Sequence, residues 1–393
     1  MTGNAPSTNR WRAQLRDDPY SLYRFLLAAD PVHWDPELGA WLLARYADVV
    51  GSLTDARFSA DRTRPDLGAD AYQLAKSMLV SDPPDHTRLR ALVQKAFTPR
   101  MVDQLRPRIV AIVGELLDRI AERGDSFDVI ADLAYPLPVV VIAELLGVPA
   151  EDRVKFHEWS AMLAASLDPQ ADAQVREGVV PARQALHAYL RGIIAERRRA
   201  PRADLISALV AAEEQGEVLR EPELVVMCTL LLIAGHETTV NLIGNGLLAL
   251  LQHPDQLQRL RSDPELISSA VEELLRFDSP VQMTARIALA PVELGGKVIE
   301  PGQWVLPLLG AANHDPAQFA EPDSLDLGRT PNPHVAFGRG IHFCLGAPLA
   351  RVEGQLALGA LIRRFGKLSL AGTPVRRDQI TLRGLQSLPV TTA

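Results

Sequence analysis

One cysteine stands in a setting that suits metal ligation. Cys344 follows the glycine-rich run Phe337-Gly338-Arg339-Gly340-Ile341-His342-Phe343, and Gly346 comes shortly after it. Glycines remove side-chain bulk around the sulfur and free backbone N–H groups to point at it, and a following helix would favour a thiolate. Because no second cysteine lies nearby, a structural zinc or iron–sulfur site is excluded, which leaves single-thiolate haem ligation or a cysteine nucleophile.

An acid and an alcohol form a second candidate group. Glu237 and Thr238 stand in the segment Ala234-Gly235-His236-Glu237-Thr238-Thr239, within a long apolar stretch that is expected to be helical. A threonine inside a helix often only bonds back to the preceding turn, which is the structural alternative. Burying a carboxylate is costly unless it is paired or serves a reaction, so the pair is interpreted as functional.

Two further pairs have helical spacing. Glu273 and Arg276 lie at i,i+3, and His86 and Arg90 lie at i,i+4, so that each pair shares one helix face. Taken alone, the first pair is usually a surface salt bridge, and a lone histidine is usually a core or surface residue. Their meaning therefore depends on the rest of the chain.

The cysteine segment resembles the ligand loop of the cytochrome P450 family, Phe-x-x-Gly-x-x-x-Cys-x-Gly. Phe337, Gly340, Cys344 and Gly346 match it, and the other motifs follow in the family's order over most of the chain. The resemblance implies a mainly α protein with small β-sheets and the cytochrome P450 fold. It also implies haem b (iron protoporphyrin IX), buried between the long oxygen-binding helix and the helix of the cysteine loop, with Cys344 as iron ligand.

The resemblance assigns roles to the other candidates. Glu237 and Thr238 would relay protons to dioxygen, a general-acid task, and the small Ala234 and Gly235 would leave a groove for the oxygen molecule. The residues that match the family's binding positions for the two haem propionates are His86, Arg90, Arg286 and His342. Ile233 and Met283 occupy positions that would face the distal substrate pocket, although plain core packing is the commoner use of such residues.

The family's buried Glu-x-x-Arg pair matches Glu273 and Arg276. Family members usually complete it with an arginine from a Pro-x-Arg-Phe segment. Here that segment is Pro322-Asp323-Ser324-Leu325, which lacks the arginine and the phenylalanine. Arg329 is the candidate substitute.

The function implied is that of a soluble, bacterial-type haem-thiolate monooxygenase. It would insert one oxygen atom from O2 into a hydrophobic small molecule, by hydroxylation or epoxidation, with electrons from a separate ferredoxin or flavodoxin. The cations expected to face an acidic redox partner around the cysteine are Arg88, Lys95, Arg339 and Arg351. The alternatives are a haem-thiolate peroxygenase and a non-enzymatic haem sensor, which do not need the acid–alcohol pair, and a cysteine hydrolase, which would bind no haem.

Hydrophobic periodicity predicts the elements that must position these residues. A small hairpin is expected from 32–34 and 41–43, and strand-like segments at 285–289 and 304–309. Helices are expected from Pro83 onward, and the clearest of them span 137–146, 181–199, 221–251, 265–277 and 347–361.

The amino-acid composition limits the class of protein to which the chain can belong. The 393 residues are 47% hydrophobic and 23% charged, which is typical of a globular protein, and a single domain over 1–393 without a fused reductase is expected. The net charge of −7 argues against nucleic acid or an anionic membrane as partner. The polar N-terminal segment Met1–Asp18 lacks the apolar core of a signal peptide, so a cytoplasmic location is expected.

Overall fold

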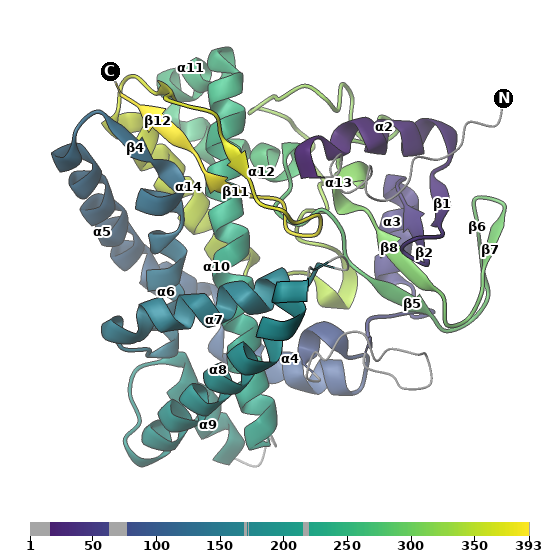
Figure 1. Ribbon diagram of the computed structural model, residues 1–393, viewed down its shortest axis with the longest axis horizontal. Coiled ribbons are helices and arrows are strands. Elements are labelled where there is room, and N and C mark those ends of the chain that lie inside the picture. Colours follow the sequence, from purple (N-terminus) through teal and green to yellow (C-terminus); the bar gives the residue numbers. More distant parts are fainter. Residues whose placement is uncertain (1–15, 63–76, 169–170, 172, 215–219, 393) are drawn as a thin grey trace.

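The computed structural model of the chain describes residues 16–62, 77–168, 171, 173–214 and 220–392. Helices occupy one side of the molecule, and the largest β-sheet lies on the other side (Figure 1). This arrangement confirms the expected mainly α architecture with small sheets.

The helical side is built around one long helix, α10 (Glu221–Gln252), which passes through the centre of the molecule (Figure 1). It packs against α6 (Pro136–Leu146), α7 (Arg153–Ala165), α8 (Ala173–Arg199), α12 (Ile267–Phe277) and α14 (Ala347–Arg364). The remaining helices of this side are α4 (Asp85–Ala96), α5 (Pro99–Arg123), α9 (Leu205–Glu214) and α11 (Pro254–Ser262).

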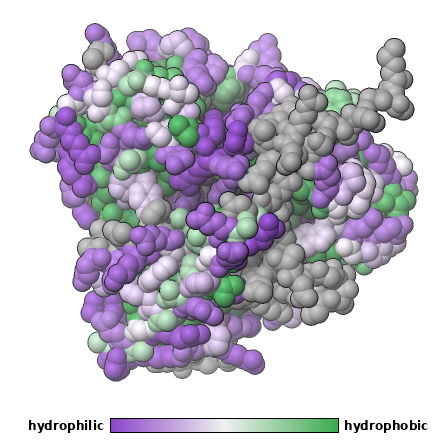
Figure 2. All heavy atoms as spheres, viewed as in Figure 1, coloured by the Kyte–Doolittle hydropathy of each residue, from purple (hydrophilic) through white to green (hydrophobic). Residues whose placement is uncertain are grey.

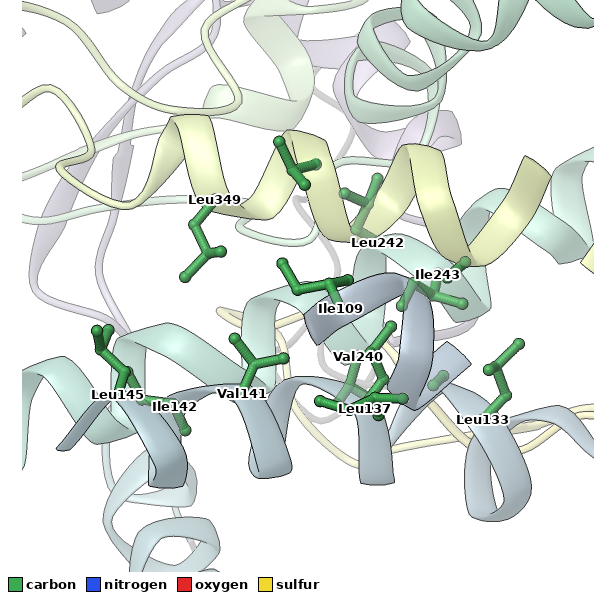
Figure 3. Packing of buried hydrophobic residues seen from close by; sticks show 14 of the residues in the cluster. Ile109, Leu133, Leu137, Val141, Ile142, Leu145, Val240, Leu242, Ile243 and Leu349 are labelled. Carbon is green, nitrogen blue, oxygen red and sulfur yellow. The ribbon is translucent and has the colours of Figure 1, made fainter. Parts of the chain in front are cut away.

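Apolar side chains from several helices meet in the largest hydrophobic cluster. Leu137 and Val141 from α6, Val240 and Ile243 from α10, and Leu349 from α14 all lie within it, as Figure 3 shows. Helix α10 is long and apolar enough to cross a membrane by length and composition. However, 67% of its most apolar part is buried inside the protein, so its composition serves this core.

The β-rich side holds a five-stranded sheet of order β1-β2-β8-β5-β3. Its strands are β1 (Val32–Asp35), β2 (Ala40–Leu43), β3 (Phe58–Ser59), β5 (Arg286–Ala288) and β8 (Trp304–Pro307). The pair β2–β8 is parallel and the other pairs are antiparallel. Short helices α2 (Pro19–Ala29), α3 (Tyr46–Thr54) and α13 (Leu309–Ala312) lie on this side.

Three smaller sheets complete the fold. The strands β4 (Ser126–Asp128), β12 (Pro389–Thr391) and β9 (Ser369–Leu370) form one, and β6 (Val292–Leu294) and β7 (Lys297–Ile299) form a hairpin. The third sheet pairs β10 (Val375–Arg376) with β11 (Leu385–Ser387), and the loop between these strands reaches α10.

Most expected elements occur where the periodicity placed them. The hairpin forms with Trp34 opposite Trp41, and α6 ends at Gly147, whose positive φ of 72° suits glycine. Two starts differ. Helix α8 begins at Ala173 and contains Pro181, because one missing N–H bond does not stop a helix of 27 residues. The start expected at 265 is a 3₁₀ turn, and α12 proper begins at Ile267.

Hydrophilic side chains predominate on the face of the molecule drawn in Figure 2. The hydrophobic residues visible there form separate small areas rather than one continuous patch. This pattern is that of a globular surface facing water.

Candidate functional site

The loop that carries Cys344 is held by its own backbone. The N–H of Cys344 donates to the carbonyl of Phe337 at 3.0 Å, which closes the loop. Gly338 and Gly340 both have positive φ, and a Cβ at Gly340 would lie 2.7 Å from the carbonyl oxygen of Leu53. Glycine is therefore required at position 340 by both conformation and space.

The thiol of Cys344 is exposed at the start of α14. Desolvation raises the pKa of the Cys344 thiol, while the backbone N–H groups of Gly346 and Ala347 and the charge of Arg90 lower it. These opposing groups are the ones that would stabilise a thiolate bound to a metal cation. Gly346 is the N-cap of α14, and a Cβ there would lie 3.9 Å from the sulfur.

The side chain of Arg351 on α14 packs against the loop that carries Cys344. Its guanidinium stacks over the ring of Phe337, 4.6 Å from the centroid, and makes two bonds of 2.6 and 2.8 Å to the carboxylate of Glu272. The loop is thus tied to α12 as well as to α14. Phe337, which the sequence placed in the cysteine motif, is a packing residue of this arrangement.

Four cationic or potentially cationic groups converge near the loop. His86 and Arg90 come from α4, Arg286 from β5 and His342 from the loop itself. The rings of His86 and His342 are 4.2 Å apart, and Arg90 donates to the carbonyl of Phe343 at 2.7 Å. The structure therefore brings together all four predicted propionate-binding residues.

Burial and the positive charges of the neighbouring arginines act together on the two histidines of this group. Burial and the charges of Arg286, His86 and Arg90 lower the pKa of His342 to about 3, and burial lowers the pKa of Arg286 to about 10. Among the residues that the structure describes, Nε2 of His86 and Nε2 of His342 are buried without a hydrogen-bond partner. Donors in this state fit the two carboxylates of a haem.

The residues Ala234, Gly235 and Thr238 lie in the middle of α10. Ala234 is exposed although it lies within a helix that is otherwise mostly buried, and the hydroxyl of Thr238 donates to its carbonyl at 2.9 Å. Gly235 faces the other way, because a Cβ there would lie 3.1 Å from Cδ1 of Ile142 on α6. The structural reason for a glycine at position 235 is thus the close approach of α6 and α10, and not the groove that the sequence predicted.

Glu237 is buried and tied to two basic residues. One carboxylate oxygen lies 3.3 Å from Nε2 of His236, and the other accepts a hydrogen bond from Nη1 of Arg377 in the β10–β11 loop. Burial alone would raise the pKa of Glu237, but His236 and Arg377 outweigh it and lower the pKa to about 2. Nε2 of His236 also lies 3.3 Å from the hydroxyl of Ser160 on α7.

The two candidate substrate residues differ in position. Ile233 is half-buried next to the exposed Ala234 on α10. Met283 is 3% exposed and packs in the hydrophobic cluster of α2 and the β1–β2 hairpin, so the prediction that it faces the distal pocket is corrected. Its apolar side chain serves the core on the β-rich side.

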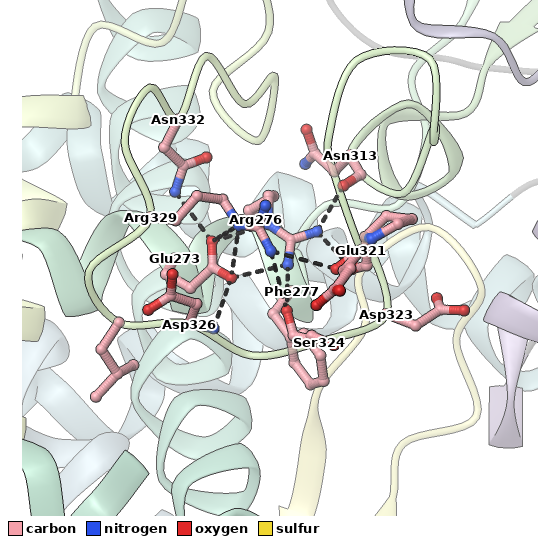
Figure 4. Close-up of polar contacts among 12 residues, drawn as sticks. Glu273, Arg276, Phe277, Asn313, Glu321, Asp323, Ser324, Asp326, Arg329 and Asn332 are labelled. Carbon is pink, nitrogen blue, oxygen red and sulfur yellow. Dashed lines mark hydrogen bonds and ion pairs between the residues drawn. The ribbon is translucent and has the colours of Figure 1, made fainter.

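The pair Glu273 and Arg276 is fully buried and has a third partner. Nε of Arg329 lies 3.1 Å from both carboxylate oxygens of Glu273, and the amide of Asn332 donates to one of them at 3.1 Å (Figure 4). Arg276 also donates to the carbonyls of Asn313, Pro322 and Ser324. Arg329 therefore takes the place of the arginine that the segment Pro322–Leu325 lacks.

Several residues of this region gave no sequence signal. Arg377 is distant in the sequence from Glu237, and nothing in its local pattern indicates that it meets a buried acid. His236 stands next to Glu237 within the apolar helix, where a histidine could have been suspected as its partner. Glu353 on α14 was also missed, and it is 1% exposed.

Comparison with known proteins gives one consistent result. The sequence model described as Cytochrome P450 matches residues 42–388. Cytochrome P450 107B1 of Saccharopolyspora erythraea is 46% identical, over 97% of this chain and 94% of that protein. Vitamin D(3) 25-hydroxylase of Pseudonocardia autotrophica is also 46% identical, over 95% of this chain and 94% of that protein.

The structure of the chain is also similar to solved cytochrome P450 structures. The crystal structure of P450BioI in complex with an acyl carrier protein ligated to hexadec-9Z-enoic acid superposes with a TM-score of 0.91 at 42% identity. The match covers 97% of this chain and 99% of that chain.

Proposed function

Because the chain belongs to the cytochrome P450 family, we propose specific roles for its residues in inserting one oxygen atom of O2 into a hydrophobic small molecule. The chain is a haem-thiolate monooxygenase of the P450 type, and it needs a substrate, O2 and a redox partner. The observation that carries the assignment of residues is the loop of Cys344 facing a cluster of cations that has unpaired donors. The cysteine hydrolase alternative is set aside by the family.

The family implies a haem, and we assign it as haem b. The thiolate of Cys344 would bind the iron, and the two propionates would be held by His86, Arg90, Arg286 and His342. Phe337 and Gly346 would shape the thiolate side, and Ala234, with Gly235 behind it, the opposite side. When bound, the haem activates dioxygen, a chemistry that amino-acid side chains do not supply.

The chain's own contribution is proton handling and exclusion of water. The hydroxyl of Thr238 would hold a proton at the oxygen site, because it lies on α10 one turn after the exposed Ala234. Glu237 is held as a carboxylate by His236 and Arg377, so it would accept and pass protons rather than store one. Glu237 would become able to accept and pass a proton when its contact with Arg377 is released.

The substrate is proposed only as a class. The vitamin D(3) hydroxylase and P450BioI relatives are named for, or bound to, apolar molecules of different shape. Of the side chains described, Ile233 is the candidate contact.

Electrons would come from a ferredoxin or flavodoxin in the cytoplasm, to a single P450 domain over 1–393. Of the cations expected at the docking face, Arg88 pairs with Glu223 and Arg351 with Glu272. Among the described residues, Arg339 donates to the neutral oxygens of Tyr46 and Pro333, so its charge would be available to an acidic partner. The side chain of Lys95 lies outside the described residues.

The first experiment is the absorption spectrum of the reduced protein with carbon monoxide. The wild type is expected to show the red-shifted Soret band of thiolate-ligated haem, and Cys344→Ala to lack it. Cys228→Ala is the matched control, because Cys228 is fully buried on α10 and burial raises the pKa of its thiol to about 12. Loss of the band in the Cys228 variant but not in the Cys344 variant would overturn the ligand assignment.

The peroxygenase and haem-sensor alternatives are separated from the monooxygenase by Thr238→Ala. In a monooxygenase this variant consumes oxygen and electrons but forms less product. A peroxygenase driven by peroxide, or a sensor, would show no such uncoupling. Product per electron pair, measured with a reconstituted redox partner, distinguishes them.

A further inference from the structure

A buried acid outside the β10–β11 loop holds both ends of that loop, which carries the Arg377 that binds Glu237. Asp278 directly follows α12 and is 8% exposed. Its Oδ2 accepts a bond of 3.1 Å from Nη2 of Arg376, at the start of the loop, and its Oδ1 accepts one of 2.7 Å from Nε of Arg383, near the end. Charge-assisted bonds are among the stronger contacts in proteins, so Asp278 joins the two ends of the loop firmly.

An asparagine on α10 holds the same two ends. Oδ1 of Asn245 accepts from Nη1 of Arg376 at 2.8 Å, and Nδ2 of Asn245 donates to the carbonyl of Arg383 at 2.9 Å. The loop also lies directly on α10 at Gly384, where an added Cβ would overlap an amide side chain of that helix. Asn245 and Asp278 are distant in the sequence, and together they form one anchor that fixes the loop on α10.

This anchor determines what Arg377 can reach. Because the preceding residue, Arg376, is held on α10, the guanidinium of Arg377 meets Glu237, which lies two turns before Asn245 on the same helix. The N–H of Arg377 donates to the carbonyl of Gly384 at 3.2 Å. That bond keeps Arg377 within the loop but does not attach the loop to α10, so the attachment depends on the anchor.

We propose that Asn245 and Asp278 are positioning residues for proton handling, because they fix both ends of the β10–β11 loop and so keep Arg377 in contact with Glu237. The inference rests on the proposed function, in which Glu237 passes protons once Arg377 is released. A weakened anchor would let the loop and its guanidinium move away from α10 more often. The time for which Glu237 stays paired is then decided at the anchor as well as at the pair itself.

Among the described residues, the charged or titratable groups that face Glu237 are His236, Arg377 and Tyr135. His236 on α10 lies 3.3 Å from one carboxylate oxygen, and Arg377 binds the other. Burial and then the charge of Glu237 raise the pKa of the phenol of Tyr135, the N-cap of α6. Loosening the loop removes only the guanidinium, since the other two groups belong to helices. The pKa of Glu237, which is lowered to about 2, should then rise toward its ordinary value.

The direct test is a double-mutant cycle of Glu237→Gln and Arg377→Leu, measured by urea unfolding of the full-length protein in two backgrounds. With the anchor intact, the two side chains are expected to be coupled. In the Asn245→Ala background, the equilibrium constant that expresses this coupling should fall by about threefold or more. Asp278→Asn, which keeps the size of the side chain and removes its charge, should give a similar fall. Unchanged coupling in both backgrounds would make the anchor purely structural and overturn the proposal.

Tyr20→Phe is the matched control for these variants. The hydroxyl of Tyr20 donates to Oδ1 of Asp278 at 2.7 Å, and the ring of Tyr20 lies 5.7 Å from the guanidinium carbon of Arg383. Phenylalanine removes the bond to Asp278, keeps the ring, and leaves both ends of the loop bound. The variant is expected to lose stability without losing the coupling between Glu237 and Arg377. If it loses as much coupling as Asn245→Ala, general loosening is the cause and the positioning role is overturned.

Infrared spectroscopy reports the charge of Glu237 independently of stability. At about pH 4 the wild type should show no carboxylic-acid band from Glu237, because the pKa of this residue is about 2. In Asn245→Ala such a band should appear, and it should disappear when Glu237→Gln is added. If no band appears in Asn245→Ala, the loop keeps Arg377 on Glu237 without the anchor, and the proposal is wrong.

Turnover with a reconstituted redox partner tests the link to proton handling. If release of Arg377 limits proton passage, the solvent isotope effect on kcat should be smaller in Asn245→Ala than in the wild type, with KM for the substrate unchanged. An isotope effect that is the same in both proteins would contradict the link. If the wild type forms no thiolate-ligated haem, the proposed function fails, whereas the cycle and the infrared band still report whether the anchor positions Arg377.

Discussion

Glu237 and Glu353 are the same residue type at similar burial, and yet the protein gives them opposite charge states. The pKa of Glu237 is lowered to about 2 because His236 and Arg377 face it, whereas burial raises the pKa of Glu353 to about 8 and, among the described residues, only the hydroxyl of Thr239 opposes this. Burial raises the pKa of both cysteine thiols, but at Cys344 the backbone N–H groups of Gly346 and Ala347 and the charge of Arg90 act against it. The pKa of each of these side chains is therefore set by the groups that surround it.

Arg377→Leu should destabilise the protein, because it leaves the buried carboxylate of Glu237 with one partner. We expect a loss of about 3 kcal/mol at neutral pH, measured by urea unfolding. The pKa of Glu237 is lower in the folded than in the unfolded chain, so the ion pair stabilises the fold above about pH 4.5 and that stability is lost as pH falls toward 2. The variant should be less sensitive to acid over this range.

The double variant Glu237→Gln with Arg377→Leu is the control for that prediction. It removes the uncompensated charge and should recover part of the lost stability. If the single variant is as stable as the wild type, the contact between Arg377 and Glu237 does not form in solution.

Glu353→Gln should change stability with the opposite pH dependence. The folded chain holds the proton of Glu353 up to about pH 8, whereas the unfolded chain releases it near pH 4.5, so wild-type stability falls as pH rises between these values. The glutamine variant lacks this loss. The difference in Tm between variant and wild type should therefore increase from pH 5 to pH 8, and a difference independent of pH would contradict the raised pKa.

At the scale of elements, glycines set the distance between α10 and its neighbours. A Cβ at Gly235 would lie 3.1 Å from Ile142 of α6, and a Cβ at Gly354 of α14 would lie 2.9 Å from Leu242 of α10. Both α6 and α14 are thus packed closely on α10. This packing fixes where Thr238 and Glu353 stand relative to the cysteine loop.

Gly354→Val should separate α10 from α14 and cost about 2 kcal/mol, because the added side chain would overlap Leu242. Gly114→Ala on α5 is the matched control: nothing lies within 4 Å of a Cβ there, and alanine favours a helix by about 1 kcal/mol over glycine. Thermal unfolding of both variants checks the prediction. Equal destabilisation by the two substitutions would show that space at α14 is not the cause.

At the scale of the whole molecule, the haem site is assembled from distant parts of the chain. His86 and Arg90 come from α4, Arg286 from the sheet on the β-rich side, and His342 from the loop before α14. Burial and the charges of Arg286, His86 and Arg90 lower the pKa of His342 to about 3, so its ring is neutral at neutral pH. A haem held as proposed by these residues would join the helical and the β-rich sides of the molecule.

Arg286→Met should weaken haem binding while leaving the haem-free protein at least as stable as the wild type. The buried guanidinium has a pKa lowered to about 10 by burial, and its removal relieves that cost. Loss of one charge-assisted bond to a propionate corresponds to about a tenfold to a hundredfold lower affinity. Haem titration and thermal unfolding with and without haem check both parts; a haem-free variant that is less stable would contradict this cost of burial.

The network around Glu273 shows where prediction from the sequence stopped. The pair Glu273 and Arg276 could be identified from its spacing and its motif, and Arg329 was a candidate third partner because the usual segment lacked an arginine. Asn332 and the carbonyls that Arg276 binds gave no signal, since they reach the pair only through the irregular loop of 313–332. Such a loop has no periodicity from which its path could be read.

The sequence by itself determined the mainly α fold through its periodicity, and the resemblance of its short motifs to the family indicated the cysteine loop and the residues His86, Arg90, Arg286 and His342. The tertiary structure alone decided that Gly235 packs against Ile142, that Met283 is buried in the core, and that Arg377 binds Glu237. It also decided that Glu353 is buried where, in the described part of the chain, no cation lowers its pKa. Burial and contact between distant segments set the charge of a side chain, and local sequence does not contain them.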